Sequence, residues 1–170
     1  MSVLSVYLIL DINQGGLGFS KESVGVIKST ITPLLYFLPI LSGAIADQFG
    51  YRKTLMFAFV VMSLGYFCTS ISTSYFAVFL SLLLMVTGAG TFKPIISGTI
   101  ARTTDQSNSA LGFGIYYWSI NLGAFLFPLF LIPFLKGIGW SYIFLMASIF
   151  TGSMLLLNLF IYKEPQRTTT

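Results

Sequence analysis

The chain has 170 residues, of which 55% are hydrophobic, 16% aromatic and only 8% charged, and its formal net charge is +4. Soluble domains carry about 25% charged residues, so this composition excludes a globular domain with a solvated surface and predicts an integral membrane protein. Most of the nine basic residues lie in short segments between apolar runs, which is typical of membrane topology rather than of nucleic-acid binding. We therefore expect a lipid bilayer around the chain and no nucleic acid among its partners.

The sequence offers little for catalysis or metal binding. It contains no histidine, and its one cysteine, Cys68, lies in an apolar run, so there is neither a disulfide framework nor a metal-ligand cluster. Paired carboxylates within an apolar segment are also missing from the sequence. We expect no catalytic residues, no metal and no enzymatic activity.

Apolar runs separated by short polar segments predict an all-α membrane protein. The first run, 1–10, is too short to span a bilayer, which needs about 20 residues, and is interpreted as the end of a longer helix. Ser20 is the predicted N-cap of the next helix, with Glu22 in its first turn. Five complete spans are predicted at about 23–46, 54–72, 75–101, 110–134 and 141–162. Together, 1–162 form one helix bundle, and 163–170 are a tail or the start of a linker.

Basic residues are divided unequally between the two predicted sides of the membrane. One side carries five of them: Arg52, Lys53, Arg102, Lys163 and Arg167. The other side carries two, or three if a lysine just inside the second helix is counted: Lys21, Lys136 and Lys28. Loops rich in lysine and arginine face the cytoplasm. We expect a multi-pass protein of the cell (inner or plasma) membrane whose C-terminus is cytoplasmic.

The turn at 43–53 combines flexible and charged residues. Gly43 permits close packing, Asp47 lies where a helix ends, and Gly50 supports a tight turn. Arg52 and Lys53 follow at the inner membrane face. A carboxylate and a guanidinium this close can form a charge-assisted hydrogen bond that holds two helices in one arrangement. The alternative is an ordinary basic loop on the cytoplasmic side.

A lysine lies inside the fourth predicted span. Lys93 follows Gly88 and Gly90 and precedes Pro94, so it lies where the helix is least regular and neighbours approach closest. An ionisable side chain within a membrane indicates a functional site by default, and this one suits a substrate carboxylate or a titrating partner. The alternative is a lysine that extends towards the cytoplasmic headgroups.

An asparagine lies near the middle of the fifth predicted span. Asn121 is one helical turn after Tyr117, so the two share a face, and Gly123 follows closely. Asn121 either contacts a ligand or forms an interhelical hydrogen bond worth about 1 kcal/mol.

Small residues also recur at spacings that let helices approach, which predicts a compact bundle: Ser42 and Ala46, Thr87 to Thr91, Ser119 and Gly123, Ser148 and Gly152.

These motifs carry a family resemblance. The turn at 43–53 resembles the G-x-x-x-D-(R/K)-x-G-(R/K)-(R/K) signature of the major facilitator superfamily, from which it departs at Gln48 and Tyr51. The motifs G-x-G-x-x-K-P at 88–94 and Y-x-x-I-N-x-G at 117–123 resemble the fourth and fifth helices of the proton-dependent oligopeptide transporter family. The two motifs occur in the family's order and spacing.

The resemblance implies a proton-coupled symporter that imports di- and tripeptides by alternating access, with a proton gradient and no cofactor. It implies an incomplete N-terminal six-helix bundle of a major facilitator transporter, with a truncated first helix and a missing C-terminal helix half as its partner. Lys93 would bind the substrate carboxylate and couple to protons, Asn121 would contact the peptide, and Asp47 and Arg52 would act in gating. The family's E-x-x-E-R proton motif lies in the first helix, upstream of Met1. Because the family binds substrate between two halves, we expect no transport by this fragment alone.

Two alternatives remain open. The chain could belong to a related facilitator that moves another small solute, an anion or a drug-like compound. It could also be a non-transporting membrane scaffold, in which Lys93 and Asn121 only join helices.

Overall fold

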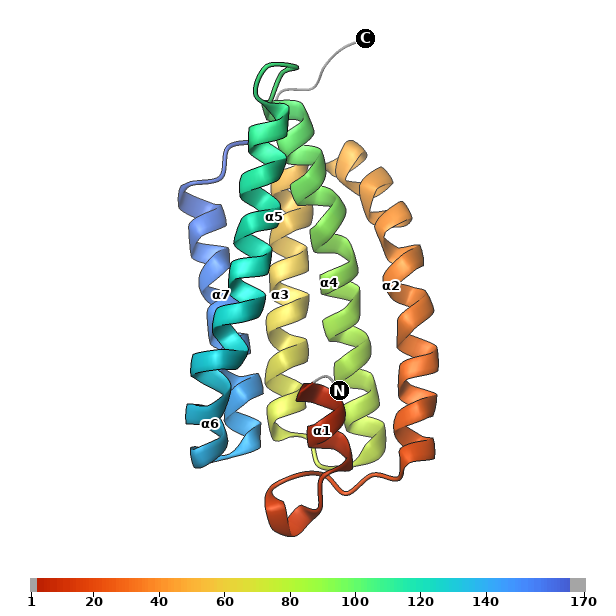
Figure 1. Ribbon diagram of the computed structural model, residues 1–170. Coiled ribbons are helices and arrows are strands. Elements are labelled where there is room, and N and C mark those ends of the chain that lie inside the picture. Colours follow the sequence, from red (N-terminus) through yellow and green to blue (C-terminus); the bar gives the residue numbers. More distant parts are fainter. Residues whose placement is uncertain (1–2, 166–170) are drawn as a thin grey trace.

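The computed structural model describes residues 3–165, and all regular structure in that range is helical (Figure 1). In chain order the elements are α1 (Val3–Ile9), the 3-10 turn η1 (Ile12–Gln14), α2 (Lys21–Phe49), α3 (Tyr51–Ile71), α4 (Tyr75–Thr103), α5 (Ser109–Leu126), the π-helical η2 (Phe127–Leu131), α6 (Ile132–Ile138) and α7 (Trp140–Phe160). Because α5, η2 and α6 form one rod, the described residues contain five helices long and apolar enough to cross a membrane. The all-α membrane fold is confirmed.

The observed helices overlap every predicted span. Ser20 caps α2 as expected, because its hydroxyl accepts a hydrogen bond from the Ser23 amide at 3.1 Å. The rod that begins with α5 runs to Ile138, beyond the predicted end at 134. Pro128 has no N–H to donate, and in this stretch the Ile132 amide bonds to the Phe127 carbonyl, five residues back. Met1, Ser2 and 166–170, which include part of the predicted tail, lie outside the described residues.

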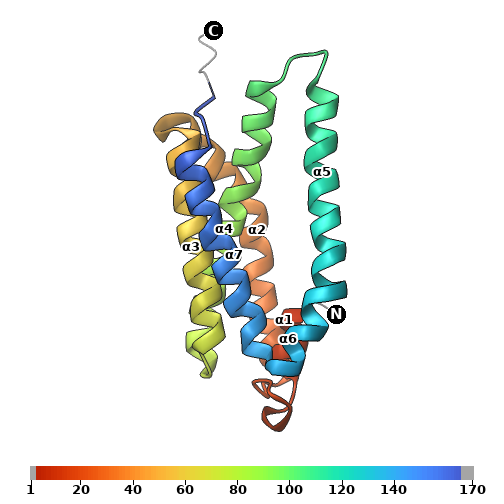
Figure 2. The same ribbon diagram turned by 90° about the vertical axis from the view of Figure 1, so that its left-hand side faces the viewer.

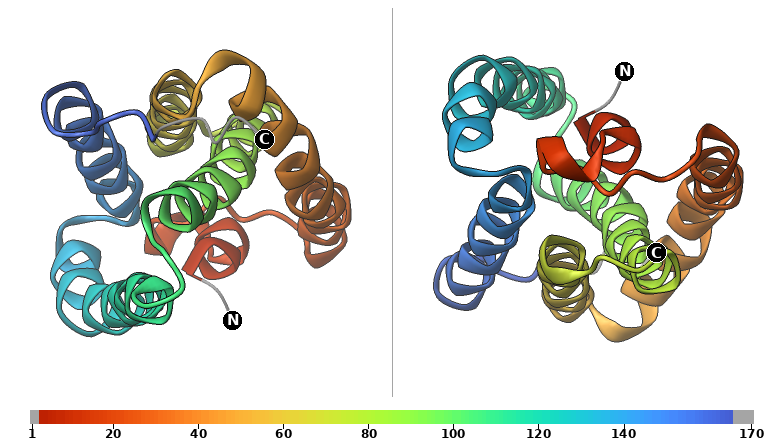
Figure 3. Two further views of the ribbon diagram at one scale, coloured as in Figure 1. Left: turned by 90° about the horizontal axis from the view of Figure 1, so that it is seen from above. Right: turned by 90° about the horizontal axis from the view of Figure 1, so that it is seen from below.

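α3 lies between α4 and α7 and packs closely against both (Figures 2 and 3). Glycines make the α3–α4 contact possible. A Cβ atom on Gly65 would lie 2.5 Å from the Met85 backbone nitrogen, and one on Gly88 would lie 2.7 Å from the Ala58 carbonyl oxygen. Gly88 therefore has the packing role predicted for it.

Two serines join α3 to α7. The Ser63 hydroxyl lies 2.9 Å from the Ser148 carbonyl, and the Ser148 hydroxyl lies 2.8 Å from the Ser63 carbonyl. In lipid, where apolar burial does not drive helices together, such hydrogen bonds and close packing hold them. The small-residue pattern at Ser148 and Gly152 is explained, because a Cβ atom on Gly152 would meet the Ser63 hydroxyl at 3.2 Å.

α5 stands apart from the packed helices. None of its residues is buried, and it approaches α4 only near their connecting loop (Figure 2), where a Cβ atom on Gly112 would meet Thr104. The close packing predicted at Gly43 and Gly123 is not seen among the described helices: a Cβ atom at either position would meet nothing within 4 Å. Both glycines lie on helix faces that no other described element covers closely.

We expect Gly65→Ala to destabilise the bundle by about 1–3 kcal/mol, because the added methyl group would overlap the α4 backbone. The matched control is Gly114→Ala on α5, where a Cβ atom meets nothing within 4 Å; the gain in helix propensity should make it neutral or slightly stabilising. Thermal unfolding of both variants in detergent micelles tests this. Equal midpoints for the two would contradict the proposed close approach of α3 and α4.

Candidate functional site

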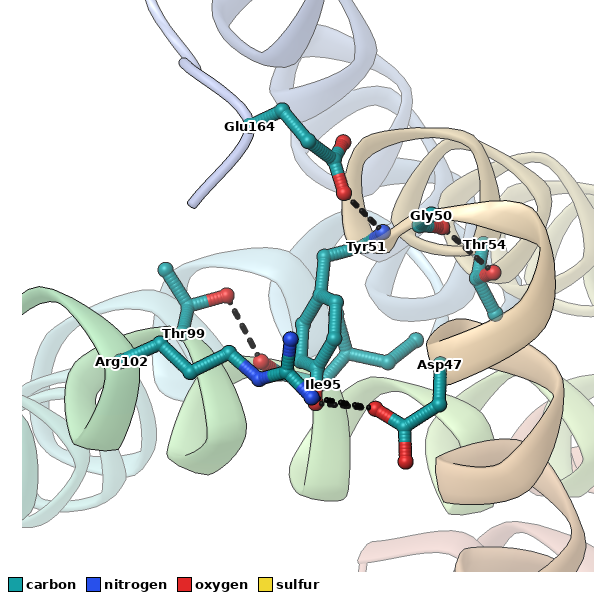
Figure 4. A network of polar contacts seen from close by, with 8 residues as sticks. All are labelled: Asp47, Gly50, Tyr51, Thr54, Ile95, Thr99, Arg102 and Glu164. Atoms are coloured by element: carbon teal, nitrogen blue, oxygen red, sulfur yellow. Dashed lines mark hydrogen bonds and ion pairs between the residues drawn. The ribbon is translucent and has the colours of Figure 1, made fainter. Parts of the chain in front are cut away.

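Polar side chains gather where α2 ends, α3 begins and α4 ends, beside the segment 161–165 (Figure 4). We call this region the Gly50 end of the bundle. Gly50 joins α2 to α3 with a φ of +97°, a conformation that favours glycine. A cavity of about 540 Å³ opens here, lined by both acidic and basic side chains.

Asp47, Tyr51 and Arg102 bring three helices together at the Gly50 end. The Arg102 guanidinium forms an ion pair with the Asp47 carboxylate at 2.8 Å. The Tyr51 hydroxyl donates to the same carboxylate oxygen at 2.9 Å, and the Arg102 guanidinium carbon lies 4.7 Å from the centre of the Tyr51 ring. One tyrosine therefore contacts both members of the ion pair, by a hydrogen bond and by a cation–π contact.

The start of α3 and the end of α7 exchange polar contacts. The backbone amides of Tyr51 and Arg52 donate to the two carboxylate oxygens of Glu164, the second at 2.8 Å. In return, the Arg52 guanidinium donates to the Leu159 carbonyl in the last turn of α7. A carboxylate at a helix N-terminus and a cation at a helix C-terminus are both favoured by the helix dipole.

A further hydrogen bond ties the segment after α7 to α4. The hydroxyls of Thr99 and Tyr162 lie 2.6 Å apart. Thr99 donates its own hydrogen to the Ile95 carbonyl at 2.8 Å, so Tyr162 is the donor to Thr99. Burial raises the pKa of the Tyr162 hydroxyl; the hydrogen bond with Thr99 opposes this shift in part, and the Glu164 charge adds to it. The phenol therefore keeps its proton at neutral pH and can donate.

The structure modifies the predicted role of the turn at 43–53. Gly50 forms the expected tight turn, and Asp47 does hold two helices together. The guanidinium that pairs with Asp47 belongs to Arg102, however, whereas Arg52 binds α7. Lys53 is exposed.

Arg102 and Glu164 were missed as members of this site. One signal for Glu164 can be read from the sequence once the start of α3 is known: the helix begins directly after a glycine and has no side-chain cap of its own, so its first amides need an acceptor from elsewhere. A carboxylate just beyond the last span was a candidate for that acceptor. The partner of Asp47 lies 55 residues along the chain and had no comparable local signal.

Lys93 lies on α4 beside a cavity of about 400 Å³ between α2 and α4, which is lined by Thr32, Leu35, Tyr36, Pro39, Ala89, Gly90 and Lys93. The Lys93 side chain is exposed. Gly90 lets α2 come close at this point, because a Cβ atom there would lie 2.8 Å from Cβ of Leu38. Pro94 lies within α4, which continues through it.

Tyr117 and Asn121 lie together on α5. The Asn121 amide nitrogen donates to the Tyr117 carbonyl at 2.9 Å, and both residues are exposed. The expected shared face is observed. The two residues are not among those that line the Lys93 cavity, because α5 stands apart from α4 over most of its length.

Within 3–165, no three His, Cys, Asp or Glu residues are grouped so that they could hold a metal ion.

The family profile and the similar proteins both identify transporters. The profile of the Major Facilitator Superfamily matches residues 1–170. The dipeptide and tripeptide permease B of Aliivibrio fischeri (strain MJ11) is 31% identical over 172 residues, which cover 98% of this chain and 32% of the permease. The uncharacterized transporter YclF of Bacillus subtilis (strain 168) is 32% identical over 131 residues, which cover 75% of this chain and 27% of that protein.

Solved structures agree with the sequence comparison. A POT family transporter in complex with a thioalcohol conjugated peptide matches with a TM-score of 0.85 and 30% identity, over 96% of this chain and 34% of the transporter. The peptide transporter POT in complex with sulfate matches with a TM-score of 0.83 and 28% identity, over 92% of this chain and 32% of that transporter. The chain thus spans about a third of the length of the relatives it matches. It belongs to the Major Facilitator Superfamily, and the solved structures that it resembles are transporters of the POT family.

Proposed function

We propose that this chain is part of a proton-coupled symporter that imports di- and tripeptides by alternating access across the cell membrane. The relatives named above as peptide transporters support the substrate class. The distribution of charge supports an orientation in which the Gly50 end and the C-terminus face the cytoplasm: that end carries Arg52, Lys53, Arg102 and Lys163, and the other carries Lys21 and Lys136. In this proposal the proton gradient is the driving force and no cofactor is needed.

The observation that carries the proposal is Lys93 beside a cavity within a membrane-length helix. An ammonium group in such a position has a free-energy cost, so its presence indicates a function by default. Every peptide with an unmodified C-terminus carries a terminal carboxylate, which Lys93 can bind through a charge-assisted hydrogen bond. Tyr117 and Asn121 present hydrogen-bonding groups on an exposed face of α5, and we assign them to peptide contact. This assignment requires α5 to move towards the substrate during the alternating-access cycle.

The gating role falls to the Gly50 end. We propose that Gly43, Asp47, Gly50, Arg52 and Lys53 control opening on the cytoplasmic side, with the Asp47–Arg102 ion pair as the contact that breaks and re-forms. The two side chains of this pair are 55% and 27% exposed, so the pair contributes at most about 1 kcal/mol of stability. A contact of this strength can open without unfolding the bundle.

The first prediction of this proposal concerns Lys93. In the complete transporter that contains this chain, Lys93→Gln should weaken binding of dialanine by about 10- to 100-fold, because a charge-assisted hydrogen bond worth about 1.5–3 kcal/mol is lost. Dialanine amide, which lacks the carboxylate, should bind the wild type and Lys93→Gln equally weakly. Calorimetry in nanodiscs measures both ligands, and Lys28→Gln on α2 is the control. If Lys93→Gln binds dialanine as the wild type does, Lys93 is not the carboxylate ligand.

A second prediction concerns the ion pair. Asp47→Arg and Arg102→Asp should each lower the maximal rate of proton-driven dipeptide uptake, because each places two like charges together. The double exchange should recover part of the rate, since it restores the pair with reversed polarity. Asp105→Asn is the control, because the Asp105 carboxylate bonds within its own loop, to Ser107. If the rise in activation free energy of the double variant equals the sum of the rises in the two single variants, the two residues are not directly coupled.

A third prediction concerns the chain alone. Transporters of this architecture bind substrate between two helix repeats, and the chain spans about a third of its relatives. We therefore expect proteoliposomes that contain only the 170-residue chain to show no proton-driven dipeptide accumulation. Accumulation above that of empty liposomes would show that the chain is a complete transporter.

A further inference from the structure

Tyr51 is bound in three ways at once. Its backbone amide donates to Glu164, its hydroxyl donates to Asp47, and its ring lies under the Arg102 guanidinium. The first contact places the residue and the other two determine where the ion pair lies. Figure 4 shows Glu164 above the Tyr51 backbone and the Asp47–Arg102 pair at the other end of the same side chain.

Glu164 reaches this position because the chain just before it is held at two further points. Tyr162 is tied to Thr99 of α4 by the 2.6 Å hydrogen bond. Leu159, at the end of α7, accepts the hydrogen bond from Arg52. A carboxylate that accepts two amide hydrogen bonds, and that follows two anchored residues, is well placed to fix the first turn of α3.

Gly50 leaves room for this carboxylate. A Cβ atom on Gly50 would lie 3.1 Å from the nearer Glu164 carboxylate oxygen, which is tighter than an ordinary contact. The glycine therefore serves the close approach of Glu164 as well as the positive φ of the turn.

We propose that Glu164 is a positioning residue for the Asp47–Arg102 ion pair and acts on it through Tyr51. Removal of the carboxylate frees the first turn of α3, and Tyr51 then no longer holds the ion pair in one arrangement. The inference rests on the gating role proposed for Asp47. It adds the segment after α7 to the elements that set the conformation of the Gly50 end.

The test measures distances between spin labels in the 170-residue chain in nanodiscs, without substrate. In a Cys68→Ser background, labels at Phe49→Cys and Gln106→Cys report on the end of α2 and on the loop after α4; both positions are exposed. The distance distribution should broaden with Glu164→Ala. It should broaden less with Glu164→Gln, because the amide oxygen can still accept one backbone hydrogen bond.

Two controls separate positioning from general loosening. Glu22→Ala removes a carboxylate at the opposite end of α2 and should leave the 49–106 distribution unchanged. A second label pair at Lys21→Cys and Ile71→Cys, both exposed and at that opposite end, should report the wild-type distance in both Glu164 variants.

A 49–106 distribution in Glu164→Ala identical to that of the wild type would overturn the inference, as would equal broadening by Glu22→Ala or at the 21–71 pair. If Glu164→Ala does not fold, Glu164→Gln decides alone: broadening confined to the 49–106 pair supports positioning, and its absence refutes it. Because no substrate is present, this result is independent of the dialanine experiment. A wrong substrate class therefore leaves the Glu164 test intact, and a failed Glu164 test leaves the substrate class intact.

Discussion

The close contact of α3 with α4 and α7 is the constraint on which the rest of this structure depends. Lipid removes the hydrophobic driving force between helices, so they associate only where backbones can approach and polar groups can pair. Gly65 and Gly88 allow the approach to α4, and the Ser63 and Ser148 hydroxyls supply the pairing with α7. With α3 held in this way, its first turn lies beside the last turn of α7.

Charged residues concentrate at the Gly50 end for a related reason. Helix ends leave backbone amides and carbonyls without partners, and the headgroup region tolerates the charges that can satisfy them. Glu164 satisfies the amides that begin α3, and Arg52 satisfies a carbonyl at the end of α7. The Asp47–Arg102 pair is weaker because it is partly exposed to solvent. Backbone contacts therefore surround a weak ion pair, which agrees with the proposal that this pair breaks and re-forms.

Much of the fold and part of the site could be predicted from the sequence. Apolar runs of membrane length located the five long helices, and Ser20 was recognised as a cap because its side chain acts on its own helix. The motif that contains Lys93 identified both the family and the cavity-lining lysine. The partner of Asp47 could not be predicted, because Arg102 and Arg52 are equivalent in charge and only the packing of α4 against α2 and α3 brings Arg102 within reach.

The sequence by itself determined the membrane class, the helix order, the unequal charge of the two ends and the family, because each follows from local composition, periodicity or motif spacing. Only the tertiary structure decided which glycines lie in contacts and how the polar residues pair. Gly43 and Gly123 resemble Gly65 and Gly88 in the sequence, yet only the latter two face another backbone. The tertiary structure also decided the acceptor role of Glu164. It arises because α3 and α7 run antiparallel, so that the start of α3 lies beside the end of α7.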